Sequence, residues 1–175
     1  MNKFFSTLVI LCCISCIYLR KSYYTHEEIF KFIEKREIPI EDSFLMTKES
    51  LKNTFPDGNI SFDMIGLKLF DKYKNQLEVS SENCSIEKIQ NTNSFEDLNI
   101  LTTNELDLYY SLYPGLKERV EKNDSYTLLV LWSVKAGRVV TNDFINLANE
   151  TNRENNAQIL YINTDVDEEY FANWD

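Results

Sequence analysis

The sequence contains a single histidine, His26, among its 175 residues. A metal site with two histidine ligands is therefore impossible, and a serine, histidine and aspartate triad has only one candidate base. We expect His26 to lie at the surface, on the first turn of a helix. Basic residues are also few: 18 Lys and Arg stand against 28 Asp and Glu, which gives a net charge of -10. This balance argues against a nucleic-acid partner, because such surfaces neutralise phosphates with basic side chains.

Glycine and proline are scarce as well, with 4 and 3 residues respectively, while 43% of the residues are hydrophobic. This composition excludes collagen-like and low-complexity chains and favours one folded domain. We find no Gly-rich phosphate loop and no HExxH or GxSxG motif. The sequence therefore predicts no metal site, no cofactor and no catalytic residue.

Cysteine is nearly absent outside the first 19 residues, where three of the four cysteines lie. Residues Phe4 to Leu19 carry no charge, and Arg20 and Lys21 follow them. The uncharged run is shorter than the about 20 residues of a membrane-spanning helix, so we interpret residues 1–19 as an export segment.

The string Cys13-Ile14-Ser15-Cys16 resembles a bacterial lipobox, in which a small residue precedes the cysteine that receives the lipid. The resemblance implies lipidation of Cys16 and a protein exported to the cell envelope, anchored on the periplasmic side or in the outer membrane. A simple cleaved signal and an uncleaved anchor are the alternatives. The spacing Cys-x-x-Cys also occurs here, but no packed fold surrounds it to tune a thiol.

Residues 20–60 are predicted to form an amino-terminal helix and an extended linker. Thr25 is a capping residue, and Glu27 and Glu28 lie in the first turn of a helix that ends near Lys35. The linker around Pro39 is expected to wrap toward the core.

The segment 65–79 has the alternating pattern of a β-hairpin, with a turn over Asp71 to Asn75. Residues 85–90 and 95–122 favour helix, and Pro114-Gly115 interrupts the second of these segments.

A continuous apolar run over 126–132 predicts a strand buried on both faces, as in a parallel sheet. Thr141-Asn142-Asp143 is predicted to cap a helix that ends near Arg153, and 159–162 is the next strand. The order of strand, helix and strand predicts a βαβ unit.

The string from Leu128 to Val139 resembles the active-site strand and turn of the thioredoxin-like superfamily, and 159–165 is similar to the next strand of that family. Trp132 and Gly137 keep the family pattern. Ala136 and Val139 stand where the two catalytic cysteines belong, and Arg138 replaces the proline. The resemblance therefore implies the family's scaffold without its disulfide exchange, which needs an attacking thiolate. The combination with an export segment is similar to small exported lipoproteins of Bacteroidetes-type bacteria.

The fold class predicted for 61–175 is α/β, a thioredoxin-like sheet flanked by helices. A thioredoxin module runs βαβ and then ββα, but here the hairpin and helices precede the βαβ unit. We therefore expect a circularly permuted sheet, ββα then βαβ. This arrangement requires the hairpin to pair beside Leu128 to Leu131, and nearby termini make permutation physically tolerable.

The resemblance implies a binding site at the end of the buried strand. Its candidate residues are Trp132, Lys135, Ala136, Gly137, Arg138 and Val139. The two cations beside a helix amino end are suited to an anionic group or an acidic peptide, and a simple polar turn is the alternative. Asp165 is expected to belong with Asp167, Glu168 and Glu169 to a solvated acidic end.

Cys84 is the only thiol left if Cys16 is lipidated, and Glu82 and Glu87 near it would raise its pKa rather than activate it. We therefore expect a non-catalytic, membrane-tethered binding domain with a protein partner. A thiol-disulfide oxidoreductase that uses Cys84 and a structural envelope lipoprotein are the alternatives.

Overall fold

The computed structural model describes residues 24–59, 63, 65–79, 95–136 and 138–166. Cys16, Cys84, Gly137 and the acidic residues 167–169, all singled out above, lie outside these ranges. The helices and strands are α2 (His26–Lys35), η1 (Ile40–Asp42), β1 (Ser43–Phe44), α3 (Lys48–Thr54), β2 (Gly66–Phe70), β3 (Gln76–Leu77), η2 (Phe95–Asp97), α5 (Leu106–Leu112), α6 (Leu116–Glu121), β4 (Thr127–Trp132), α7 (Arg138–Asn155) and β5 (Gln158–Asn163).

The five strands form one mixed sheet in the order β1-β5-β4-β2-β3. The three strands β1, β5 and β4 run parallel to one another, whereas β2 is antiparallel to both β4 and β3. The α/β class and the parallel βαβ unit are therefore confirmed. The hairpin also pairs beside the buried strand, with Leu67 opposite Val130 and Leu69 opposite Leu128.

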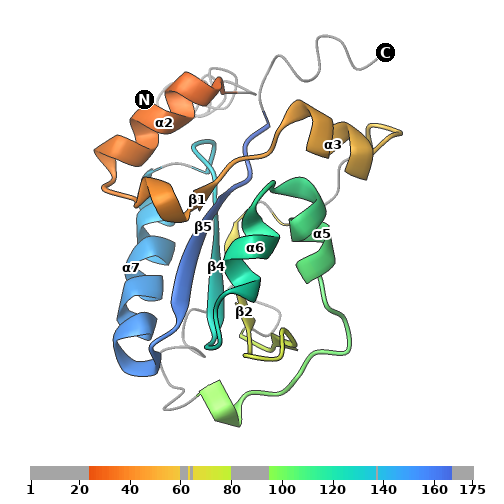
Figure 1. The fold of residues 1–175 in the computed structure, drawn as a ribbon. Coiled ribbons are helices and arrows are strands. Elements are labelled where there is room, and N and C mark those ends of the chain that lie inside the picture. The colour runs from red at the N-terminus through yellow and green to blue at the C-terminus, as the bar shows by residue number, and fades with distance from the viewer. Residues whose placement is uncertain (1–23, 60–62, 64, 80–94, 137, 167–175) are drawn as a thin grey trace, which may run out of the picture.

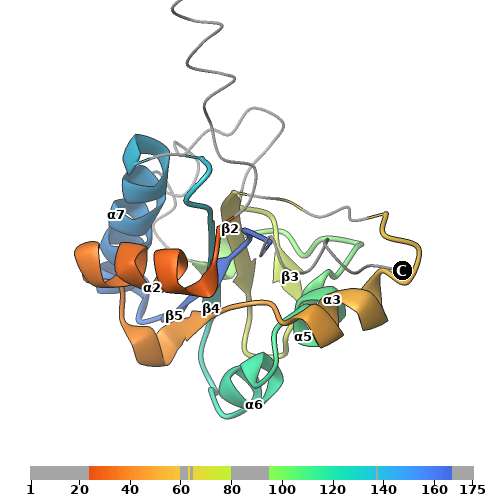
Figure 2. The same ribbon diagram turned by 90° about the horizontal axis from the view of Figure 1, so that it is seen from above.

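Helices cover both faces of the sheet. α2 and α7 lie on one face, and α3, α5 and α6 lie on the other (Figures 1 and 2). Successive residues of β4 point to opposite faces, so that Leu129 and Leu131 join the core under α5 and α6 while Val130 and Trp132 join the core under α2 and α7. All six residues of β4 are buried, which is why this strand has no polar face in the sequence.

The amino-terminal helix begins where the sequence predicts. The Thr25 hydroxyl accepts a hydrogen bond from the Glu28 backbone N–H (3.3 Å), and the Thr25 backbone N–H donates to Glu28 Oε2 (2.9 Å). This capping box satisfies two backbone donors, and Ile29 and Ile33 are buried on the inner side of the helix. The segment that follows contains η1 and the short edge strand β1, which the extended-linker prediction did not include.

The helical prediction for 95–122 is correct only in part. Residues 98–105 are not helical: the Leu101 N–H donates to the carbonyl of Gln76 (2.8 Å), and the Glu78 N–H donates to the carbonyl of Asn99 (2.9 Å), which pairs this stretch with the hairpin. α5 then begins at Leu106. Just before the helix, the Glu105 N–H donates to Gln76 Oε1 (2.9 Å). The break before α6 is where it was predicted, and Gly115 there adopts a left-handed conformation with φ of 82°.

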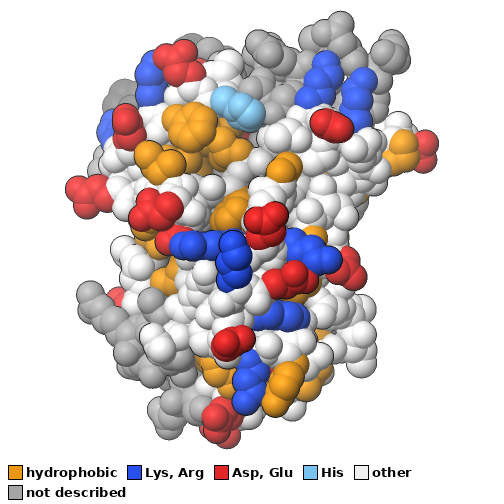
Figure 3. Space-filling model, viewed as in Figure 1, with side chains coloured by type: hydrophobic (Ala, Val, Ile, Leu, Met, Phe, Trp, Pro, Cys, Tyr) orange, Lys and Arg blue, Asp and Glu red, His pale blue; other side chains and the backbone are white. Residues whose placement is uncertain are grey.

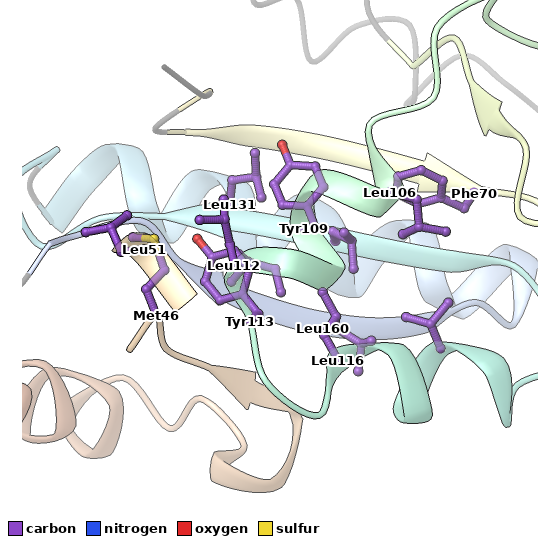
Figure 4. Packing of buried hydrophobic residues seen from close by; sticks show 13 residues of the cluster. Met46, Leu51, Phe70, Leu106, Tyr109, Leu112, Tyr113, Leu116, Leu131 and Leu160 are labelled. Atoms are coloured by element: carbon purple, nitrogen blue, oxygen red, sulfur yellow. The ribbon is translucent and has the colours of Figure 1, made fainter. Parts of the chain in front are cut away.

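The core under α5 and α6 is rich in tyrosine. Figure 4 shows Tyr109, Tyr113 and Leu116 packed against Leu131 and Leu160 of the sheet. The rings of Tyr109 and Tyr113 stack with centroids 6.4 Å apart. Burial, with a smaller contribution from nearby Glu105 and Asp63, raises the pKa of Tyr109, and burial raises the pKa of Tyr113 well above its ordinary value.

A half-buried lysine connects β2 to the start of α5. Lys68 Nζ lies 2.6 Å from Asp63 Oδ2 and 2.7 Å from Glu105 Oε2. Burial opposes the positive charge, but the two carboxylates outweigh it and raise the pKa of Lys68. This ion-pair cluster fixes the helical segment over its face of the sheet.

We expect the two buried tyrosines to make the protein unfold in alkali. Their pKa values are raised in the folded state, whereas unfolded tyrosine ionises near pH ~10, so the stability is complete below that pH and falls as the pH rises above it. Each group contributes a slope of about 1.4 kcal/mol per pH unit in that range. Tyr113→Phe should therefore show a shallower loss of urea stability above pH ~10 than the wild type. An unchanged slope would contradict this assignment.

Candidate functional site

The candidate site lies where two parallel strands end. β4 ends at Trp132 and β5 ends at Asn163, directly opposite one another in the register. Residues 133–136 then turn the chain into α7, and 164–166 leave β5 beside them. We call residues 133–136 and 163–165 the carboxyl-edge site; it lies at the upper edge of the sheet in Figure 1.

Asp165 organises this site. Its carboxylate accepts hydrogen bonds from Ser133 Oγ (2.6 Å), from the Val134 backbone N–H (2.6 Å) and from the Asn163 side-chain amide (2.9 Å). The Lys135 N–H reaches both Ser133 Oγ (3.0 Å) and Asp165 Oδ1 (3.4 Å). Ser133 and Asn163 are buried and Asp165 is 7% exposed, so the network is shielded from water. The expectation that Asp165 belongs to a solvated acidic end is therefore wrong.

Further bonds fasten the ends of the two strands to each other. The Thr164 N–H and hydroxyl both donate to the carbonyl of Trp132, at 2.9 and 3.0 Å. The hydroxyl of Tyr113, which is fully buried, donates to the carbonyl of Asn163 (3.1 Å). The carboxyl-edge site is thus supported from the strand ends and from the helical layer below.

Trp132 supports the site from the other face of the sheet. Its ring is fully buried and stacks on Phe32 of α2, with centroids 5.3 Å apart and planes inclined by 12°. The Arg36 guanidinium lies 4.9 Å from the Phe32 ring centroid and donates to Asn142 Oδ1 of α7. The indole N–H of Trp132 has no hydrogen-bond partner within the described ranges. Because its ring is buried, Trp132 supports the turn at residues 133–136 from inside the fold and does not line a surface.

The predicted binding residues occupy different positions around the turn. Lys135 and Ala136 lie in the turn and are partly exposed. Arg138 and Val139 belong to the first turn of α7, which begins three residues earlier than the predicted cap at Thr141. The network around Asp165 was missed in the sequence, since it joins residues about 30 positions apart that share no local pattern.

The carboxyl-edge site contains no thiol and no accessible serine hydroxyl among its described residues. All four cysteines lie outside the described residues, and positions 136 and 139 are Ala and Val. The Ser133 hydroxyl is fully buried and engaged with Asp165, so it is not accessible as a nucleophile. Among the described residues, no group of His, Cys, Asp and Glu side chains is arranged to hold a metal ion.

One face of the molecule carries side chains of both charges (Figure 3). On the face shown in Figure 3, acidic and basic side chains alternate, and hydrophobic side chains gather at the upper left, over α2. Within the residues described, no helix combines the length and apolar character needed to cross a bilayer.

Comparison of the chain with protein-family models, curated proteins and solved structures gave no match.

Proposed function

We propose that this protein is a non-catalytic binding domain with a circularly permuted thioredoxin-like sheet, held at a membrane of the bacterial cell envelope by a lipid on Cys16. Its carboxyl-edge site binds a protein partner. The single observation that carries the proposal is the turn at residues 133–136, which a buried carboxylate fixes in one conformation although the site contains no thiol.

The strand arrangement supports the permuted fold. The permutation requires the hairpin β2–β3 to lie beside β4 and the terminal βαβ unit to be parallel, and both pairings occur.

The rigidity of the turn supports a role in binding. A surface whose backbone is already fixed loses little conformational entropy when a partner docks on it. Four donors converge on Asp165 and hold the Val134 and Lys135 backbones, while the side chains of Lys135 and Ala136 remain partly exposed. Lys135 adds a cation that suits an acidic group on the partner.

The short connection to the lipidated residue supports a site close to the membrane. Seven residues separate Cys16 from Tyr24, the first described residue. A fully extended connection of this length spans about 25–30 Å, so a lipid on Cys16 would keep the domain within that distance of the bilayer surface.

The lipid anchor is tested by the intact mass of the protein purified from bacterial membranes. We expect a chain that begins at Cys16 and carries added acyl mass. Cys16→Ala should abolish both the acyl mass and membrane retention, while Cys13→Ala serves as the matched control and should keep them. An unmodified wild-type chain that begins at Met1 would refute the anchor.

The binding site is tested by placing a photoreactive amino acid at Lys135 or, as a control, at the exposed Lys117 of α6. We expect one discrete crosslinked product in envelope preparations from the Lys135 position and none from Lys117. The product should disappear when Asp165→Ala is added, because the turn then loses its support. Equal crosslinking at both positions, or products that contain only this chain, would overturn the proposed site.

A further inference from the structure

The edge of the sheet beyond β3 carries backbone groups that no strand uses. Leu77 of β3 forms an antiparallel bridge with Ile100. The two hydrogen bonds of this bridge, from Glu78 to Asn99 and from Leu101 to Gln76, lie on either side of the bridged pair. In such a pair the N–H and C=O of Ile100 point away from β3. Neither group has a hydrogen-bond partner in the described structure. We call residues 99–102 the outer edge; it continues the sheet on the β3 side, which Figure 2 shows.

The outer edge lacks the features that usually protect a free strand. Residues 98–104 contain no charged residue and no proline. Asn99 and Thr102 are exposed, and Ile100 is 59% exposed, which makes it one of the most exposed large hydrophobic side chains described. Residues 98–104 therefore carry no feature of their own that would prevent a further strand from pairing with them.

Acidic residues flank this edge on both sides. Residues 95–107 contain four acids, which are Glu96, Asp97, Glu105 and Asp107, and no Lys, Arg or His. Lys68 pairs with Glu105, whereas Asp97 and Asp107 form no ion pair among the described residues, so acidic charge remains on both sides of the edge. Two copies of this edge would bring like charges together, whereas a basic segment would complement them.

We propose that the outer edge accepts an extended, basic segment of a protein partner as an additional strand of the sheet. Backbone hydrogen bonds to Ile100 supply the affinity, a hydrophobic side chain of the segment packs on Ile100, and flanking Lys or Arg residues meet the acids. This surface is distinct from the carboxyl-edge site, so it does not depend on the function proposed for that site.

The test uses the full-length protein in detergent and two labelled, end-capped peptides. One has the sequence Lys-Lys-Thr-Val-Thr-Val-Lys-Lys, and the other carries Glu in place of every Lys. Fluorescence anisotropy should show saturable binding of the basic peptide that weakens with salt, and no binding of the acidic one. Ile100→Pro removes an N–H that makes no bond in the folded protein, and it should weaken binding about tenfold or more. Ile100→Thr keeps the backbone donor and should weaken binding only a few-fold.

Amide hydrogen exchange of the wild type provides a second measurement that does not depend on the folding of the proline variant. The basic peptide should slow exchange at residues 99–102 and leave the turn at 133–136 unchanged. The proposal is overturned if the basic peptide fails to bind at millimolar concentration, if both peptides bind equally, or if binding leaves the exchange at 99–102 unchanged. A dimer that dissociates in Ile100→Pro would show that a second copy occupies the edge, and would overturn it too.

Discussion

Replacing Asp165 with alanine is expected to lower the free energy of unfolding by about 3 kcal/mol, because it removes the carboxylate that four buried or half-buried donors share, although the Lys135 N–H still reaches Ser133 Oγ. These donors are the Ser133 hydroxyl, the Val134 and Lys135 backbone N–H groups and the Asn163 side-chain amide. Hydrogen exchange at the Val134 and Lys135 amides should accelerate in the same variant. Urea unfolding followed by far-ultraviolet circular dichroism measures the stability.

Two comparison variants test whether the loss of stability comes from the carboxylate of Asp165. Asp165→Asn keeps one acceptor oxygen but turns an amide group toward the remaining donors, so we expect it to lose at least half as much stability as Asp165→Ala. Asp143→Ala removes an exposed carboxylate of α7 and should change stability by no more than about 0.5 kcal/mol. If Asp165→Ala were as stable as Asp143→Ala, the carboxylate would not support the turn.

Replacing Trp132 with alanine is expected to cost about 3–5 kcal/mol, the usual range for removing a buried aromatic ring. The ring is fully buried between β4 and α2 and stacks on Phe32, so its loss leaves a cavity beneath the carboxyl-edge site. Denaturant unfolding monitored by far-ultraviolet circular dichroism gives the change without relying on tryptophan fluorescence.

Trp132→Phe separates the packing of the ring from its N–H group. The smaller ring retains an aromatic stack on Phe32, and it removes an indole N–H that has no partner in the described structure. We therefore expect a loss of only about 1–2 kcal/mol. A loss as large as that of Trp132→Ala would show that the N–H makes a bond that stabilises the fold.

Local patterns predicted the elements whose structure depends on nearby residues. The apolar run of β4, the alternation around the β2–β3 turn and the Thr25 capping box each gave an element close to the observed bounds. Each of these signals lies within a short stretch of sequence. A strand buried on both faces gives an apolar run, a strand with one buried face gives an alternation with a period of two, and a helix cap involves residues within four positions of one another.

Patterns failed where a distant residue decides the local conformation. Residues 98–105 have helical spacing, but backbone bonds to Gln76 and Glu78 pair this stretch with the hairpin, and it is not helical. α7 begins at Arg138 and not at the predicted cap near Thr141, and Asp165 holds the turn before it from a position about 30 residues away. No local signal can encode a hydrogen bond to a residue so far along the chain.

The sequence by itself determined the α/β class, the buried central strand, the hairpin and the absence of thiols at positions 136 and 139. The tertiary structure alone decided that the hairpin lies antiparallel to β4, that Asp165 is buried and that Trp132 supports the turn instead of lining it. One physical reason explains why the sequence predicts the first set of features and not the second. Hydrophobic periodicity is a property of neighbouring residues, whereas strand order and buried polar networks depend on which segments meet in space.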